Sequence, residues 1–359
     1  MITISLCMIV KNEEEVLARC LDSVKDIVDE IIIVDTGSTD RTKKIAAAYT
    51  EHVYDFPWIE DFSAARNYSF SKGTKEYCMW LDADDVINDE NKHKFLDLKR
   101  NMNPQVDIVM MKYHTNFDEA GNPTFSYYRE RLIKNHKGYQ WQSPIHEVIT
   151  PCGNVIYSET GVEHRKLKPG DPDRNLRIFE KMIRDGMKLD SRQQFYYARE
   201  LYYHQRYEEA KVVLLTFLDS GSGWMENQIE ACRQLAQCYY RLDMEETALQ
   251  ALFRSFAYDV PRAEICCDIG RHFFDRQKIQ LAIFWYKMAA DTERKDRQGG
   301  FVLPDSYDYI PYLQLCVCYD KLGDYSTANA YNEKAGKIKP ASATFLANKE
   351  YFRKKLHSI

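Results

Sequence analysis

The first third of the chain alternates short apolar runs with segments of helical periodicity. Apolar runs that predict strands lie at residues 2–10, 30–35, 53–56, 77–81 and 107–113. Segments with apolar residues at helical spacing lie at 13–25, 41–49, 63–73 and 91–101. Regular alternation of strand and helix is typical of a parallel sheet covered by helices. We therefore expect an α/β domain here.

A less regular region follows and then ends at a junction. Residues 116–123 predict a hairpin turn that carries Glu119-Ala120-Gly121-Asn122, and further strands are predicted at 127–133 and 155–162. The run from Lys166 to Asp173 holds two prolines and a glycine, which favour a break between domains. The sequence thus predicts a first domain at residues 1–170 and a second at 171–359.

The second domain has a helical pattern that repeats. Similar short segments end in Ala210, Ala248, Ala282 and Ala328, which are 38, 34 and 46 residues apart. A 34-residue period and the Leu322-Gly323-Asp324-Tyr325 turn are typical of tetratricopeptide repeats. The long last interval fits an insertion around residues 294–309. We expect stacked helix pairs that cover one another's apolar faces; an unrelated helical bundle is the alternative.

Composition narrows the class of protein. The 359 residues carry a formal net charge of -5, which argues against a nucleic-acid-binding protein. The ten cysteines include no C-x-x-C pair, so we expect reduced thiols and a cytoplasmic location rather than zinc or disulfides. The first residues predict a strand, not a signal peptide. No apolar run approaches ~18 residues, so no membrane span is expected.

Acidic residues gather where two predicted strands end. The run Trp80-Leu81-Asp82-Ala83-Asp84-Asp85 closes one strand, and Asp35 ends another. Closely packed carboxylates repel one another unless a cation lies among them, and a divalent metal with oxygen ligands can bridge a diphosphate. A solvated turn is the alternative for the acidic run. Asp35 is predicted to accept the imide N–H of uracil, or else to cap the turn that follows it.

Four motifs in order resemble the family 2 glycosyltransferases of GT-A fold. They are Ser5-Leu6-Cys7-Met8-Ile9-Val10-Lys11-Asn12-Glu13, Ile33-Val34-Asp35-Thr36-Gly37-Ser38-Thr39-Asp40-Arg41-Thr42, Asp61-Phe62-Ser63-Ala64-Ala65-Arg66-Asn67 and the acidic run at 80–85. The resemblance covers about the first 165 residues. With the repeats, the chain is similar to the tailed branch of this family, which includes the glycocin synthases that attach sugar to a peptide cysteine or serine.

The resemblance implies roles for particular residues. Asp82 would hold the ribose side of the donor, and Asp84 would hold a divalent metal, Mn²⁺ or Mg²⁺. Arg66 would steady the acidic cluster or meet phosphate, with a structural ion pair to an aspartate as the equal alternative. The other residues implied to line the nucleotide-sugar pocket are Val10, Asn12, Glu13, Asp35 and Ala83.

A second string is similar to the acceptor side of the family. In Gly138-Tyr139-Gln140-Trp141-Gln142-Ser143-Pro144-Ile145-His146-Glu147, we expect Glu147 to be the base that an inverting transfer needs to take the acceptor proton. The alternative is that His146 and Glu147 brace the loop. His164 is a candidate metal ligand or phosphate donor, although a lone histidine is more often structural. The sequence lacks a Gln-x-x-Arg-Trp motif, which argues against a processive polymerase.

These observations predict an inverting, metal-assisted transferase. Its donor is expected to be a nucleotide sugar, such as a UDP-sugar, and its acceptor a peptide, a protein or a glycan. The repeat domain is expected to grip a peptide acceptor or to form a homodimer. One alternative is a catalytically inactive repeat-based peptide-binding scaffold. Another is a nucleotidyltransferase, although the first strand is followed by Lys11-Asn12-Glu13-Glu14 rather than by a glycine-rich phosphate loop.

Overall fold

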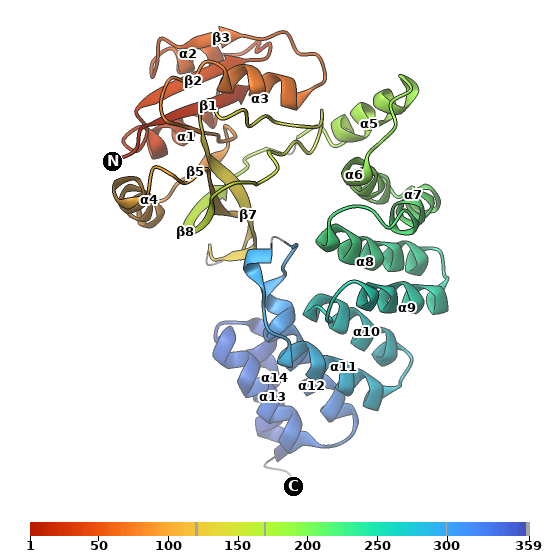
Figure 1. Ribbon diagram of the computed structural model, residues 1–359. Helices are drawn as coiled ribbons and strands as arrows, with labels where there is room; N and C mark the ends of the chain where they lie inside the picture. Colours follow the sequence, from red (N-terminus) through yellow and green to blue (C-terminus); the bar gives the residue numbers. More distant parts are fainter. Residues whose placement is uncertain (119–120, 169, 299, 357–359) are drawn as a thin grey trace. The chain divides into compact units, whose positions relative to one another are not determined.

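The computed structural model describes residues 1–118, 121–168, 170–298 and 300–356. They form two compact units, Met1–Leu189 and Asp190–Ile359 (Figure 1). The first unit is α/β and the second is all-helical, which confirms the predicted fold class. None of the described helices has the length and apolar character needed to cross a bilayer. Residues 119 and 120 of the predicted hairpin turn lie outside the described residues.

The first unit extends further than the predicted end at residue 170. The helix α5 (Arg174–Arg184) belongs to this unit. Its Phe179 is fully buried and stacks on His146, with ring centroids 6.1 Å apart. On the exposed side, Lys181 pairs with Glu60 at 2.6 Å. The break therefore falls at Leu189, after α5, and the proline-containing run before this helix is an internal connection.

One mixed sheet forms the centre of the first unit. Its strands are β1 (Ile4–Val10), β2 (Glu30–Asp35), β3 (Val53–Asp55), β4 (Tyr77–Met79), β5 (Asp85–Val86), β6 (Ile108–Phe117), β7 (Pro123–Lys134) and β8 (Val155–His164). They lie in the order β3-β2-β1-β4-β7-β6-β8-β5. The first four strands are parallel, as predicted. The strand predicted at 107–113 is β6, which runs in the same direction as these four strands and pairs in parallel with β8. It does not lie beside them, however, because the antiparallel strand β7 separates it from β4.

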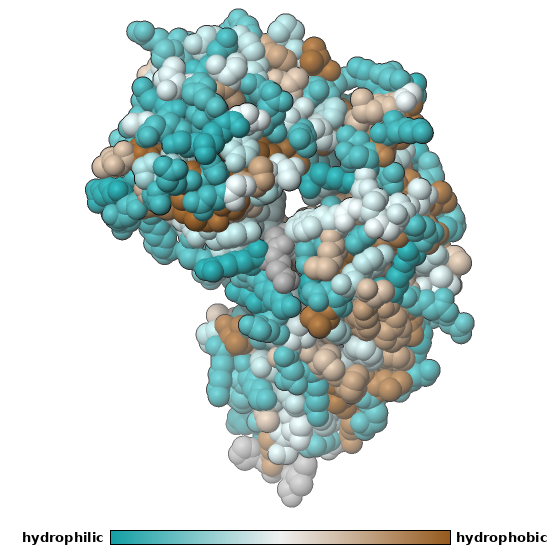
Figure 2. All heavy atoms as spheres, in the orientation of Figure 1, coloured by the Kyte–Doolittle hydropathy of each residue, from teal (hydrophilic) through white to brown (hydrophobic). Residues whose placement is uncertain are grey.

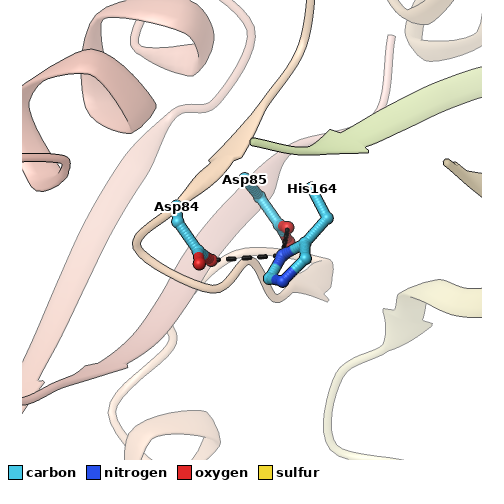
Figure 3. Close-up of side chains that lie close together, drawn as sticks. All are labelled: Asp84, Asp85 and His164. Atoms are coloured by element: carbon cyan, nitrogen blue, oxygen red, sulfur yellow. Dashed lines mark hydrogen bonds and ion pairs between the residues drawn. The ribbon is translucent and has the colours of Figure 1, made fainter. Parts of the chain in front are cut away.

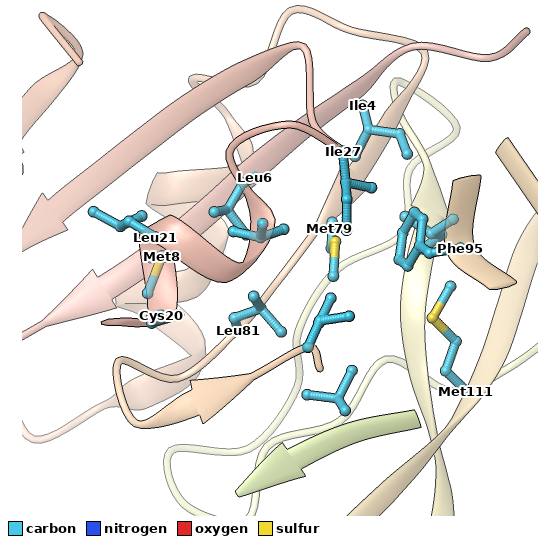
Figure 4. Close-up of a cluster of buried hydrophobic side chains, with 14 of the residues drawn as sticks. Ile4, Leu6, Met8, Cys20, Leu21, Ile27, Met79, Leu81, Phe95 and Met111 are labelled. Atoms are coloured by element: carbon cyan, nitrogen blue, oxygen red, sulfur yellow. The ribbon is translucent and has the colours of Figure 1, made fainter. Parts of the chain in front are cut away.

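Helices cover both faces of this sheet. The helices before α5 are α1 (Leu17–Val24), α2 (Thr42–Ala46), α3 (Phe62–Phe70) and α4 (Asp89–Asn101). The largest core cluster joins one face of β1, through Leu6 and Met8, to Leu21 of α1 and Phe95 of α4 (Figure 4). On the other face, Cys7 packs in a smaller cluster with side chains of α3. Because β1 is packed on both faces, the position of its carboxyl end is fixed, and so is the start of the loop that follows it.

The helix α1 begins four residues later than predicted. The backbone N–H of Glu13 donates to Thr42 Oγ1 at 2.7 Å, and that of Glu14 donates to Asp40 at 3.2 Å. These residues thus bind the loop after β2 instead of starting a helix, although they carry acidic side chains that suit a first helical turn. The consequence is a continuous wall formed by the ends of β1 and β2.

The second unit consists of four helix pairs and a last helix. They are α6 (Ser191–Tyr203) with α7 (Tyr207–Asp219), α8 (Met225–Arg241) with α9 (Glu245–Arg254), α10 (Ala263–Asp275) with α11 (Ile279–Asp291), α12 (Tyr309–Lys321) with α13 (Tyr325–Ile338), and α14 (Ala343–Leu356). The four repeated alanines each occupy the fourth position of a second helix and are fully buried. The predicted repeat is therefore confirmed.

The turns within the four pairs share one strained position. Gln205, Asp243, Gln277 and Gly323 each lie two residues before the second helix and have φ between 57° and 77°. An L-residue in this left-handed conformation costs roughly 1–2 kcal/mol, and only glycine avoids that cost. The repeat thus holds its turn geometry even where the sequence offers a less suitable residue.

We expect Gly323→Ala to destabilise the second unit by about 1 kcal/mol, because the added Cβ meets no neighbour but strains the backbone at φ 77°. Urea unfolding followed by circular dichroism measures this loss. The reverse change at the equivalent turn, Gln277→Gly, serves as the control and should not lower the unfolding midpoint. Equal midpoints for Gly323→Ala and the unaltered protein would contradict the strain argument.

Candidate functional site

Asp35 lies at the carboxyl end of β2 and is almost fully buried. Its Oδ1 accepts hydrogen bonds from the backbone N–H groups of Gly37 at 2.9 Å and Ser38 at 2.8 Å. Its Oδ2 is also buried but has no hydrogen-bond partner among the described residues. An unsatisfied buried carboxylate oxygen is costly. The arrangement therefore leaves one oxygen of Asp35 ready to accept a hydrogen bond from a ligand.

Val10 and Asn12 shape the loop that follows Asp35. The side chain of Val10 is part of the core, and its carbonyl accepts the backbone N–H of Thr36 at 2.9 Å. Asn12 has a φ of 56°, and its Oδ1 accepts the backbone N–H of Thr39 at 2.8 Å. The sequence predicted that both residues line a nucleotide pocket, and the contacts described here hold together the loop that would form it.

A cluster of three potential metal ligands forms where β5 pairs with β8. The antiparallel register places His164 opposite Asp85. His164 Nδ1 lies 3.2 Å from Asp84 Oδ1 and 3.3 Å from Asp85 Oδ1 (Figure 3). One ligand atom from each residue lies within 4.8 Å of the others. Two residues that the sequence singled out for a metal are thus neighbours, and Asp85 is a third that it did not assign.

The electrostatics of this cluster suit a cation. Burial, together with the negative charges of Asp84 and Asp82, raises the pKa of Glu13 to about 7. Burial lowers the pKa of His164, but its hydrogen bonds to Asp84 and Asp85 outweigh this and raise the pKa to about 10. Both groups thus hold a proton more tightly than usual, because that proton offsets the negative charge of the neighbouring aspartates. A divalent cation would offset the same excess, and carboxylate oxygens with an imidazole nitrogen can ligate it.

Asp85 ties this cluster to the interior of the unit. It is fully buried, and its Oδ1 accepts the hydroxyl hydrogen of Tyr113 at 2.8 Å. Its Oδ2 accepts the backbone N–H of Asp82 at 3.0 Å and Nη1 of Arg131 at 3.2 Å. Arg131 is also fully buried, with its guanidinium 3.8 Å from the centre of the Trp80 ring. These contacts fix the loop that carries the three acids.

A second cluster is centred on Arg66 of α3. Its Nη2 donates to Asp82 Oδ1 at 2.7 Å, and its Nε donates to Glu147 Oε1 at 2.6 Å. The guanidinium lies over the rings of Trp80 and Trp141, at 4.6 and 5.1 Å. Partial burial raises the pKa of Asp82, but the charge and hydrogen bond of Arg66 outweigh it and lower the pKa to about 2. In this structure Arg66 therefore joins two carboxylates.

The loop that carries Glu147 is anchored to the same helix. Asn67 of α3 accepts the backbone N–H of Trp141 at 2.8 Å and donates to its carbonyl at 2.9 Å. Gln142 and Val148 form an antiparallel bridge that closes the loop. The side chain of Glu147 is 13% exposed, so it can still meet a ligand. Two neighbouring residues of one predicted motif thus hold both the acidic loop and the loop of Glu147.

Comparison with known proteins shows the family of this part of the chain. The family model "Glycosyl transferase family 2" matches residues 5–162. The first unit is a family 2 glycosyltransferase domain. The match agrees closely with the first 165 residues that the motifs indicated, and its span includes both clusters except His164.

Several proteins are similar to this chain. A TPR repeat-containing protein of Synechococcus elongatus is 38% identical over 42% of this chain and 36% of its own length. The SPbeta prophage-derived glycosyltransferase SunS of Bacillus subtilis is 29% identical over 58% of this chain and 51% of its own length. The chain thus spans about half or less of these relatives. The crystal structure of MamA is 18% identical over 48% of this chain and 87% of its own, with a TM-score of 0.37.

The sequence did not indicate every residue of the candidate site. The sequence places Asp85 in the acidic run but assigns it no role, and it indicates no role for Arg131 or Tyr113. A signal existed for Arg131, because it is the last of three successive charged residues, after Arg129 and Glu130, in the strand predicted at 127–133. A charge at such a position is almost never fully buried unless it is paired. No comparable signal marks Tyr113, because tyrosine is common in strands.

We expect Asp85→Ala to destabilise the glycosyltransferase domain by about 3–5 kcal/mol, the usual cost of leaving the partner of a buried ion pair uncompensated. Both side chains of the Asp85–Arg131 pair are fully buried. Urea unfolding monitored by tryptophan fluorescence measures the change. Asp97→Ala, which removes an exposed acid from α4, should shift stability by less than about 0.5 kcal/mol. Similar effects of the two substitutions would show that the buried pair is not a structural support.

Proposed function

We propose that the chain transfers a sugar from a UDP-sugar to an acceptor hydroxyl or thiol, with inversion at the anomeric carbon. One observation carries this proposal. The loop of residues 82–85 belongs to both clusters, since Asp82 binds Arg66 and Glu147 lies on the other side of that arginine, while Asp84 and Asp85 contact His164. The proposed donor side and acceptor side would thus meet at one short segment of the family 2 glycosyltransferase domain.

On the donor side, the free buried oxygen of Asp35 would accept the imide N–H of uracil. Asp82 would contact the ribose, with Glu13 and Ala83 beside it. Asp84 and His164, together with Asp85, would hold Mn²⁺ or Mg²⁺. When bound, that metal offsets the charge that develops on the departing diphosphate.

On the acceptor side, Glu147 would take the acceptor proton. As the acceptor oxygen or sulfur bonds to the anomeric carbon, the bond from that carbon to the diphosphate oxygen breaks, and UDP leaves with the bonding electrons. A single displacement of this kind needs a base but no enzyme nucleophile. Arg66 and the bridge of the Gln142–Val148 loop would keep the carboxylate of Glu147 in position.

For the acceptor we propose a peptide or protein, with a glycan as the second candidate. The repeat unit supports a peptide, since repeat arrays present extended binding surfaces. The same unit is proposed to form a homodimer. The second helices α9 and α11 carry exposed apolar side chains, which are Phe253, Leu281, Phe284 and Met288. Figure 2 shows hydrophobic surface in brown over this part of the second unit.

Isothermal titration of the full chain with UDP, with and without Mn²⁺, tests the donor side. We expect binding that depends on the metal and disappears when EDTA is added. UDP binding that is equal without metal, or no binding under either condition, would contradict the proposal, and the latter result would favour the inactive scaffold. A hydrolysis assay across nucleotide sugars then identifies the donor that the domain uses.

A further inference from the structure

The insertion between α11 and α12 lies against the repeat unit itself. Its second part, Gly300–Tyr307, is called the strap here and ends in the short 3-10 helix η3 (Pro304–Tyr307). The strap contacts α6, α8 and α10, the first helices of three successive pairs. Stacked helix pairs present an extended concave surface for binding. The strap thus follows the course that an extended peptide would take along the array.

The amino-terminal half of the strap is held by one aromatic side chain. The ring of Phe301 lies 6.2 Å from that of Phe195 on α6, and the guanidinium of Arg199 lies 4.6 Å from the centre of the Phe301 ring. Just before it, a Cβ on Gly300 would lie 2.5 Å from Oε2 of Glu226 on α8. The backbone at Gly300 therefore lies so close to α8 that a side chain would fit there only if Glu226 moved. The contact site of the Phe301 ring, formed by Phe195 and Arg199, is called its seat here.

The carboxyl-terminal half is held by one buried acid. Glu264 of α10 is only 6% exposed. Its Oε1 accepts the backbone N–H of Leu303 at 2.7 Å, and its Oε2 accepts the hydroxyl hydrogen of Tyr307 at 3.1 Å. A backbone N–H is present in any peptide, so this acid can bind a foreign chain as well as the strap. The groove thus offers an aromatic seat and a backbone anchor.

The strap does not fill the groove completely. A cavity of about 30 Å³ remains between the strap and the helices, and its lining includes Glu230 and Arg233 of α8. These two side chains approach only to 3.9 Å, and burial raises the pKa of Glu230. Protein interiors normally leave few voids of this size. A ligand that reached these charged groups would make contacts that the strap does not make.

We infer that the repeat unit is a peptide-binding site that its own strap keeps closed. The partner is an extended peptide with an aromatic side chain for the seat of Phe301 and a backbone N–H, two residues later, for Glu264. Binding of such a peptide displaces the strap. This inference depends only on the second unit, so it holds or fails independently of sugar transfer by the first.

A labelled synthetic peptide with the sequence of residues 300–308 is the probe, and fluorescence anisotropy with the full chain is the measurement. We expect the variant Phe301→Ala/Leu303→Pro to bind the probe at least ~10-fold more tightly than the unaltered chain, because a tethered competitor acts at a high effective concentration. A probe with alanine in place of its phenylalanine, and a variant that also carries Glu264→Ala, are the controls and should lose this gain. Equal affinity of the variant and the unaltered chain for the probe would overturn the inference.

Hydrogen exchange on the unaltered chain gives a second test that does not depend on the variant folding. We expect the amides of the strap to exchange faster than those in the middle of α8 and α10, because the strap opens without unfolding of the array. Strap amides that exchange only as slowly as those of α10 would show a permanent part of the core, and the inference would then be wrong.

Discussion

Asp84→Asn is expected to abolish metal-dependent UDP binding and to lower the rate of sugar transfer by at least ~100-fold. A bound metal contributes several kcal/mol to stabilising the leaving diphosphate, and each ~1.4 kcal/mol corresponds to a factor of ten in rate. Asn keeps the shape of the side chain and can still accept a hydrogen bond from His164, but it loses the charge that a divalent cation requires. Titration with UDP and Mn²⁺, together with steady-state kinetics, measures both losses.

The matched control is Asp97→Asn, which changes an exposed acid of α4 that belongs to neither cluster. It should leave binding and turnover unchanged. Because Asp84 is not part of the buried Asp85–Arg131 pair, its substitution should also shift the melting temperature by no more than about 2 °C. Near-normal turnover of Asp84→Asn would remove the metal from this cluster, and a large loss of stability would mean that the acid is structural.

The fold of the first unit could be predicted as far as local periodicity determines it. The apolar runs predicted β1, β2 and β4, and the acids at the ends of these runs predicted where the candidate site lies. The neighbours of a strand depend on contacts that are distant in sequence, and this is why the antiparallel insertion of β7 between β4 and β6 was not predicted. The helix α5 was predicted in the second unit for the same reason, since it is contacts distant in sequence, with His146 and Glu60, that show where it belongs.

The candidate site, too, has features that the local sequence could predict and features that depend on contacts distant in sequence. Asp82, Asp84 and Asp85 are adjacent in the sequence, so their proximity could be predicted, and the motifs of the family directed attention to Arg66 and Glu147. The pairing of β5 with β8 brings His164 to the acids from about 80 residues away. Nothing in the local pattern distinguishes a histidine that contacts Asp84 and Asp85 from one on the surface. The support from Arg131 depends likewise on a register that only the folded sheet defines.

The repeat unit shows a third limit of prediction. The alanine spacing revealed an insertion between the third and fourth helix pairs, because a regular repeat makes any extra residues visible. Whether such an insertion projects into solvent or folds back onto the array is decided by single contacts. Here Phe301 and the Glu264 carboxylate decide it, and neither residue differs in kind from many others along the chain.

Glu147→Gln is expected to leave UDP binding intact and to lower turnover by ~100-fold or more, the usual range for loss of a general base. The amide of Gln can still accept the hydrogen bond from Arg66 that the Glu147 carboxylate receives at 2.6 Å, so the loop should keep its position. Gln cannot take the acceptor proton, however. Donor affinity measured by titration and initial rates measured with a fixed acceptor separate these two effects.

Glu90→Gln provides the control, because Glu90 is an exposed glutamate on α4 that pairs only with Lys94 among the described residues. It should leave both donor affinity and turnover unchanged. If Glu147→Gln turned over at the normal rate, the base would have to be sought elsewhere. If it lost UDP binding as well, the carboxylate would instead act through Arg66 and Asp82 on the donor side. The two clusters share the loop at 82–85, and this substitution therefore decides on which side of that loop Glu147 acts.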